Sequence, residues 1–361
     1  MRSIGLLFLL LSFSTIKGSS NDSTKVIELT GYMEAYYAYD FGQPEKNLRP
    51  SFFYSYNVHD ALNLNIGYVK ASLNKTKFRS NLALMGGTYS TYNLATEKGF
   101  LKNLLEANIG FKISKKHKLW LDAGVLPSHI GFESAIGKDC WNLTRSILAD
   151  NSPYFETGLR LGFTSKNDSF NFNFLVLNGW QKIGFNNGIP SLAFGTQINY
   201  KKNDRTTYNW STFLGHTVTD SSKRLRCFNN FYTQYQLNDK LGFIVGLDYG
   251  IQQKKDSLNK INGLQSWYAP IIIAQLKLHK KLKMATRFEY YSDKNMVLIS
   301  TPSNKAFQTF GTSLNLDFQI SESTLLRLEA RTLYSKEAVF LNRLKPTNYN
   351  TFITTSLSVA F

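Results

Sequence analysis

The chain has 361 residues, of which 14% are aromatic, and a formal net charge of +17. Its composition, rich in Tyr, Phe, Asn and Gly, stays the same from residue 28 to residue 361, so we expect one continuous architecture and not two domains. Two cysteines, Cys140 and Cys227, are too few for a disulfide scaffold, although they could pair with each other if their loops meet.

Residues 1–20 have the order of a secretory signal peptide, with a basic residue, a short apolar run and then small residues. Beyond residue 20, no apolar run approaches the ~20 residues that a transmembrane helix needs. An exported chain of this kind is secreted, periplasmic or a membrane barrel. We expect residues 21–361 to form a single transmembrane β-barrel domain.

From Glu28 onwards, segments of roughly 10–13 residues alternate apolar and polar side chains. In the segment Leu241–Gln252, for example, Val245 and Leu247 lie on one face and Asp248 on the other. Successive side chains of a strand point to opposite faces, so each segment predicts a strand with one apolar and one polar surface. Segments of this length match the ~9–11 residues of a tilted membrane-spanning strand and exceed the ~5–6 residues usual in globular proteins.

The connections between these segments fall into two classes that interleave strictly. The short turns are Asn74–Thr76, Ser114–Lys118, Lys166–Asp168, Lys202–Arg205, Asn238–Lys240, His279–Lys281 and Ser321–Ser323. The long loops are Asp40–Asp60, Tyr89–Asn103, Leu126–Pro153, Gln181–Pro190, Val218–Arg226, Gln253–Ser266, Asp293–Lys305 and Ser335–Asn348. Short periplasmic turns and long external loops are typical of outer-membrane barrels, and this count predicts an all-β, antiparallel barrel of about sixteen strands. A barrel of fourteen strands would require two of these segments to lie outside the membrane.

Two local features refine this prediction. In the second segment, Leu64 and Val69 are both apolar but fall on opposite faces, which indicates a β-bulge between them. The last segment ends in Phe361, and a final apolar strand that closes in Phe resembles the C-terminal signal of bacterial outer-membrane barrels. We therefore expect the chain to contact outer-membrane lipid, and the barrel-assembly machinery through Phe361.

Closing the barrel turns the polar faces inward, and charged residues on those faces would then line an aqueous lumen, because an Arg or Lys facing lipid costs ~2–4 kcal/mol near mid-depth. The lumen-lining candidates are Lys112, Asp122, Glu156, Arg160, Asp248, Arg287, Glu289, Arg327, Glu329 and Arg331. An excess of basic residues would favour anions weakly, although much of the excess lies in the short turns, where it need not select any solute.

Catalytic and cofactor signals are absent from the sequence. The five histidines show no metal-ligand spacing such as HExxH, and a pairing of His129 with Ser134 lies in no recognisable motif. We therefore expect no enzyme activity, no metal site and no cofactor. A nucleic-acid partner is not expected either, since the basic residues of this exported chain are scattered with the strand period.

Five segments of the chain have a specific pattern: GVLPSHIGFESA (124–135), NLTRSILADNSPYFETG (142–158), VLNGWQKI (176–183), and the first strands GYMEAYYAYD (31–40) and LNLNIGYVKASL (62–73). In these segments the sequence resembles the OmpL-like family of β-barrel porins. The resemblance implies an outer-membrane porin, but it does not bring a substrate with it.

In general porins the third external loop folds into the barrel and narrows it. The longest connection here, Leu126–Pro153, is also the third, and the resemblance implies a constriction formed at or near Glu133, Asp139, Arg145 and Asp150. The alternative is that this loop packs outside, as a lid or against a neighbouring subunit.

The function we expect is passive diffusion of small hydrophilic solutes or ions across the outer membrane, in a chain that could form a homo-oligomer. A second hypothesis is a structural or binding barrel, an adhesin or a subunit of an envelope complex, whose lumen is closed. A third is a soluble exported β-sandwich. Conductance and detergent dependence distinguish the three.

Overall fold

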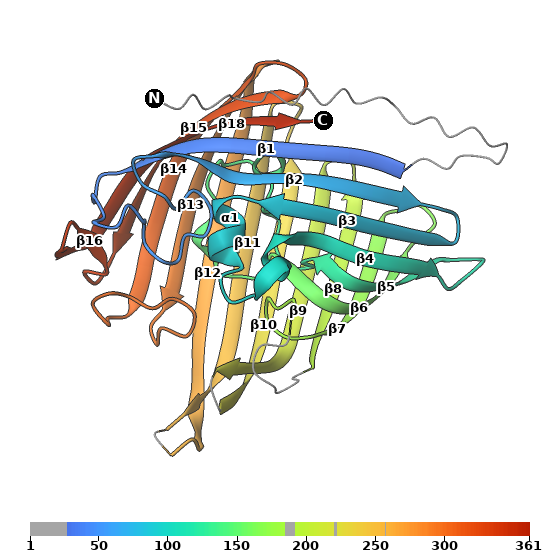
Figure 1. Ribbon diagram of the computed structural model, residues 1–361, viewed down its shortest axis with the longest axis horizontal. Coiled ribbons are helices and arrows are strands. Elements are labelled where there is room, and N and C mark those ends of the chain that lie inside the picture. The colour runs from blue at the N-terminus through green and yellow to red at the C-terminus, as the bar shows by residue number, and fades with distance from the viewer. Residues whose placement is uncertain (1–26, 185–191, 220–221, 257) are drawn as a thin grey trace, which may run out of the picture.

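A computed structural model describes residues 27–184, 192–219, 222–256 and 258–361, so the predicted signal peptide at residues 1–20 lies outside the described part. Sixteen antiparallel strands form a closed barrel in which β1 pairs with both β2 and β18 (Figure 1). The strands are β1 (Ile27–Asp40), β2 (Leu62–Asn74), β3 (Phe78–Gly86), β4 (Leu104–Lys112), β5 (Lys118–Pro127), β6 (Phe155–Thr164), β7 (Phe170–Leu177), β8 (Ala193–Asn203), β9 (Thr206–Thr219), β10 (Ser222–Gln236), β11 (Leu241–Lys255), β12 (Ile261–His279), β13 (Leu282–Asp293), β14 (Phe307–Gln319), β15 (Thr324–Ser335) and β18 (Tyr349–Ala360).

The remaining elements lie in the connections on one side of the barrel. They are α1 (Thr88–Asn93), the 3-10 helices η1 (Gly99–Asn103) and η2 (Gly137–Asp139), α2 (Ile147–Asp150) and a small separate hairpin of β16 (Phe340–Asn342) and β17 (Lys345–Thr347). Within the described residues, no helix has the length and apolar character to cross a bilayer. The predicted architecture and strand count are confirmed.

The barrel is apolar outside and polar inside, the reverse of a water-soluble protein. On β15, the exposed fraction is 42% for Leu328 but 0% for the neighbouring Arg327 and Glu329. On β11, Val245 is 52% exposed, whereas Asp248 is 2% exposed. Alternation along each strand therefore presents an apolar surface to the surroundings and collects charged groups in the interior, as a membrane barrel requires.

The predicted bulge in the second segment is present. The register of β1 and β2 shifts between Glu34 and Ala35, which pair with Ile66 and Leu64 and leave Asn65 as the extra residue. Asn65 and Ile66 are both fully buried, so two successive side chains point inward. The extra residue explains why the apolar positions change face along β2.

Two predicted long loops are largely strand. β9 and β10 extend to Thr219 and from Ser222, and β11 and β12 extend to Lys255 and from Ile261, so the expected loops 218–226 and 253–266 are wrong as loops. These strands continue beyond the membrane-spanning length, and the β11–β12 hairpin projects from one end of the barrel (Figure 1). Part of the expected loop at 181–190 lies outside the described residues.

Candidate pore constriction

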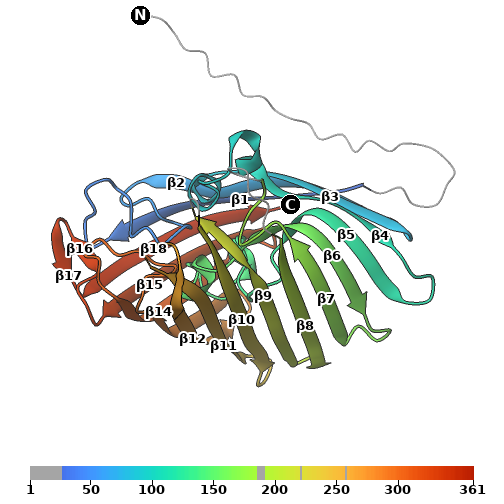
Figure 2. The same cartoon turned by 90° about the horizontal axis from the view of Figure 1, so that it is seen from below.

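The third loop (residues 128–154) joins β5 to β6 and carries η2 and α2. Around the ring of strands, eight strands separate β5 from β14 on one side and six on the other, so the two strands stand nearly opposite each other. The loop nevertheless hydrogen-bonds to inward-facing side chains of β13, β14 and β15. It therefore crosses the barrel interior, and Figure 2 shows this green segment within the ring of strands.

Arg327 of β15 holds the part of the loop around η2. Its guanidinium donates to the backbone carbonyls of Gly137 at 2.7 Å and Cys140 at 3.0 Å. Its Nε lies 2.6 Å from Oδ1 of Asp317 on β14. Backbone carbonyls buried away from water need such donors, so Arg327 fixes the turn to the wall. Cys140 is buried and Cys227 is exposed, and both are free thiols, so they do not pair.

A second cluster, formed by Arg287, Glu289, Glu329 and Arg331, holds the next part of the loop. Arg287 donates a hydrogen bond to a backbone carbonyl within residues 144–147, at 2.7 Å. Glu289 accepts a hydrogen bond from a backbone N–H of the same stretch, also at 2.7 Å. Arg287 lies 2.9 Å from Glu329, and Arg331 lies 2.5 Å from Glu289. The two positive and two negative charges compensate one another in a site that is closed to water, and removing one of them leaves a buried charge unpaired.

Three of the charged residues that we singled out in the loop lie inside it. The Arg145 guanidinium donates to three backbone carbonyls of the loop. Glu133 accepts hydrogen bonds from the backbone N–H of Ser146, at 3.0 Å, and from its hydroxyl. Asp150 is 2% exposed. These groups therefore set the shape of the loop, and Arg145 has no exposed surface to offer a solute.

The stem of the loop is fixed to the opposite part of the wall. Nδ1 of His129 lies 2.8 Å from a carboxylate oxygen of Glu156 on β6, and Nε2 lies 2.8 Å from a carbonyl oxygen of β9. The N–H of Gly131 donates to Asn230, whose amide donates in turn to Asp248 at 2.6 Å. The loop is thus attached at both ends of its path across the lumen.

The first loop (residues 41–61) also enters the barrel, which sequence reasoning missed. The Arg49 guanidinium carbon lies 4.4 Å from the ring centre of Phe53 and 3.6 Å from that of Phe352. The Tyr56 hydroxyl donates to Glu34 at 2.8 Å. The apolar side chains of both loops share one buried cluster. Adjacent phenylalanines in a nominally water-facing loop were the available signal that it is buried.

The wall formed by β2 to β6 is covered less completely. Lys70 lies 2.9 Å from Glu106, and Asp122 binds both Arg79, at 2.7 Å, and Arg160, at 3.1 Å. The side chains of Arg79, Arg160 and Lys70 remain 31%, 26% and 26% exposed. Gly110 lies between Arg79 and Asp122, and a Cβ there would stand 2.2 Å from the Asp122 carboxylate, so the glycine makes room for this ion pair.

Asp139, at the end of η2, lies at the surface of the loop. Its side chain is 52% exposed and pairs with Lys138 at 3.1 Å. Asp139 lines a cavity of about 380 Å³ between the loop and the β2–β4 wall, which Lys70 and Glu106 also line. It lines a second cavity, of about 370 Å³, on the side of the short turns. The exposed carboxylate of Asp139 therefore borders open space on both sides of the loop.

The sequence matches one family model over residues 26–361, the family described as "Putative beta-barrel porin-2, OmpL-like". The chain belongs to this porin family. It is therefore an outer-membrane β-barrel and not an enzyme, and both of these expectations are confirmed. Among curated proteins, none matches the chain by sequence.

Solved porin structures share this fold at low sequence identity. The anion-selective porin of Comamonas acidovorans superposes with a TM-score of 0.61 at 12% identity, covering 93% of this chain and 99% of that one. OmpT of Vibrio cholerae in its trimer form gives 0.57 at 7% identity, covering 93% and 99%. OmpF of Salmonella typhi, in complex with daunomycin, gives 0.53 at 9% identity, covering 93% and 97%.

The ten predicted lumen-lining residues divide into two groups. The first group lies on the less covered wall and consists of Lys112, Asp122 and Arg160. The second group is shielded from solvent within the loop-filled interior and consists of Glu156, Asp248, Arg287, Glu289, Arg327, Glu329 and Arg331. Arg79, Lys70 and Glu106 were missed, although their inward positions follow from the same alternation on β2, β3 and β4. Among the described residues, no group of three or more potential metal ligands occurs.

The buried Asp150 predicts a pH dependence of stability. Burial raises the pKa of this loop carboxyl from 3.8 to about 8, although Arg331 and Arg145 act in the opposite direction. Between about pH 4 and pH 8 the folded protein therefore holds a proton that the unfolded chain has lost, so stability falls as pH rises through this window. We expect the urea midpoint in detergent to fall from pH 5 to pH 8, and Asp150→Asn to reduce this slope. An unchanged slope in Asp150→Asn would contradict the assignment.

Proposed function

We propose that this porin passes small hydrophilic solutes and ions by passive diffusion, through a passage between the third loop and the β2–β6 wall. The observation that carries the proposal is the attachment of the loop to β13, β14 and β15, which directs it away from β2–β4 and leaves the cavity beside Lys70 and Glu106. Asp139 and Glu133 line the loop side of that cavity, and we assign the exposed carboxylate of Asp139 to the constriction, while Glu133 supports the loop from inside.

The charges along this passage support a weak preference for anions. Four basic residues project from the wall, Lys70, Arg79, Lys112 and Arg160, against the two carboxylates of Glu106 and Asp122. A narrow aqueous space lined mainly by one sign of charge raises the local concentration of the opposite ion. The excess is small and Asp139 opposes it, so the expected selectivity is modest.

A closed structural or binding barrel is the second candidate. It is favoured by the first and third loops, which together bury an apolar cluster inside the barrel. The two candidates differ in whether solvent is continuous past Asp139, and conductance measures that directly.

The test is planar-bilayer recording of the purified protein. We expect stepwise open-channel currents and a reversal potential, under a salt gradient, that indicates anion preference. Arg79→Gln removes one wall charge and should shift the reversal potential towards cations, while Lys260→Gln, on the projecting hairpin, should leave it unchanged. Absence of current would support the closed barrel, and cation selectivity of the unmodified protein would refute the anion preference.

We further propose a homo-oligomer. Its support is the trimer form of the similar OmpT barrel and the short strands of one side, where β3 to β7 have 8 to 10 residues against 19 in β12. On this side, where the strands are short, copies of the barrel could pack against one another without burying the projecting hairpin. The mass of the detergent-solubilised protein, measured by light scattering, tests this.

A further inference from the structure

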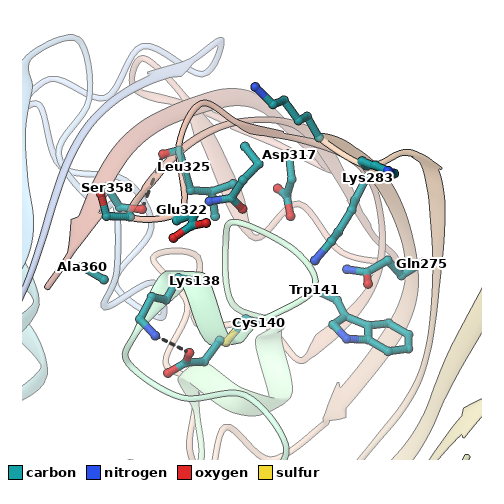
Figure 3. A pocket seen from close by; sticks show the side chains of 15 residues that line it. Lys138, Cys140, Trp141, Gln275, Lys283, Asp317, Glu322, Leu325, Ser358 and Ala360 are labelled. Carbon is teal, nitrogen blue, oxygen red and sulfur yellow. Dashed lines mark hydrogen bonds and ion pairs between the residues drawn. The ribbon is translucent and has the colours of Figure 1, made fainter. Parts of the chain in front are cut away.

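A polar cavity lies on the turn side of the third loop, next to the constriction (Figure 3). Its volume is about 370 Å³, within the ~300–1,000 Å³ of small-molecule sites. The loop segment 138–141 forms one wall, and the ends of β12 to β15 and of β18, with the turns between β12 and β15, form the others. Asp139 borders both this cavity and the one beside β2–β4, so the space adjoins the proposed passage.

Among the charged groups that have no ion-pair partner in the described chain, basic groups outnumber acidic ones in the lining. Lys280, Lys281 and Lys283 lie in or beside the turn between β12 and β13, and none of their ammonium groups pairs with a carboxylate of the described chain. Figure 3 shows Lys283 reaching into the cavity between Asp317 and Gln275. The Asp317 carboxylate is already neutralised by an arginine of β15. The free cations therefore favour an anionic group in this space.

An aromatic ring and an amide complete the wall. The Trp141 ring lies beside Gln275 in Figure 3, and its edge approaches β11 where Gly242 leaves room, since a Cβ there would stand 2.9 Å from Cη2 of Trp141. The Gln275 side chain makes no hydrogen bond with any described residue. A flat ring with a free amide and an ammonium group suits a solute that has an apolar ring face, hydroxyl groups and a negative charge.

We propose that this cavity is a binding subsite for sugar acids, monosaccharide rings that carry one carboxylate. The proposal rests on the porin function above and names a solute class for it. Trp141 stacks on the ring, Gln275 bonds a hydroxyl group, and Lys283 binds the carboxylate. Asp139, Asp317 and Glu322 also line the cavity, so a singly charged carboxylate fits it better than a doubly charged phosphate.

The test measures equilibrium binding of D-glucuronate to the full-length protein in detergent by calorimetry. Glucose, which lacks the charge, and acetate, which lacks the ring, are the comparison solutes. We expect glucuronate to bind at least tenfold more tightly than either. Lys283→Gln should weaken glucuronate binding about tenfold, the loss typical of one charge-assisted hydrogen bond, and Trp141→Phe should weaken it less. Lys260→Gln is the matched control and should not change it.

Equal binding of glucuronate and glucose, or unchanged affinity in Lys283→Gln, would overturn the subsite. The exposed, unpaired Lys283 can be replaced without disturbing the anchoring of the loop, so loss of binding in that variant is not a folding effect. Glucuronate binding without open-channel current would uphold the subsite and refute the porin proposal. Current without glucuronate binding would refute the subsite alone.

Discussion

Replacing Arg287 by Met is expected to release the third loop from the barrel wall and to lower the free energy of unfolding by ~3–5 kcal/mol, the usual effect of removing one partner from a buried ion pair. Arg287 is fully buried, donates to a backbone carbonyl of the loop at 2.7 Å and lies 2.9 Å from Glu329. Without it, Glu289 and Glu329 share Arg331 alone. Urea unfolding in lipid vesicles measures the stability, and single-channel recording should show a larger, noisier conductance.

Two variants make this result specific. Arg205→Met removes an arginine whose pair with Asp239, at 3.6 Å, is solvent-exposed, so the expected loss is below about 1 kcal/mol. Arg287→Met combined with Glu329→Gln removes one charge of each sign and keeps an acceptor for the loop backbone, so it should recover most of the stability. If Arg287→Met matched the unmodified protein in both stability and conductance, the cluster would not be what holds the loop.

The barrel could be predicted from the sequence because strand alternation is a local property. Val245 and Asp248 face opposite ways in any strand that contains them. Closure of the barrel then determines only which of the two faces points inward. The bulge at Asn65 was visible for the same reason, since an extra residue reverses the alternation between Leu64 and Val69. Polar residues in the β11–β12 hairpin concealed its extension, because a strand that stands in water need not keep an apolar face.

The contents of the barrel could not be predicted in the same way. Arg327 and Arg160 are both basic residues at inward positions, yet the first is covered by the third loop and the second remains partly exposed. Alternation distinguishes inside from outside but not a water-filled interior from a protein-filled one. The pairing of Arg79 with Asp122 spans the intervening strand β4, and only the register across three strands brings these residues together.

Replacing Leu314 by Arg is expected to lower the free energy of unfolding by ~2–4 kcal/mol, because this position faces lipid near mid-depth. Leu314 is one residue from the middle of β14 and is 49% exposed, while its neighbours along the chain, Ser313 and Asn315, are buried inside the barrel. A guanidinium at this position must either lie in the hydrocarbon or bend towards an interface. Urea unfolding in vesicles measures the loss, and heat-modifiable migration reports the folded fraction.

The matched control places the same side chain on the other face. Asn173 of β7 points into the barrel, where its amide donates to Gln197 at 2.9 Å, and it is partly exposed. Asn173→Arg should therefore change stability by less than about 1 kcal/mol, since it loses one hydrogen bond but stays in water. Leu314→Met, which keeps the size and apolar character, should also be nearly neutral. Equal losses in Leu314→Arg and Asn173→Arg would mean that the two faces do not differ in their surroundings, and the assignment of an apolar outer surface to lipid would then fail.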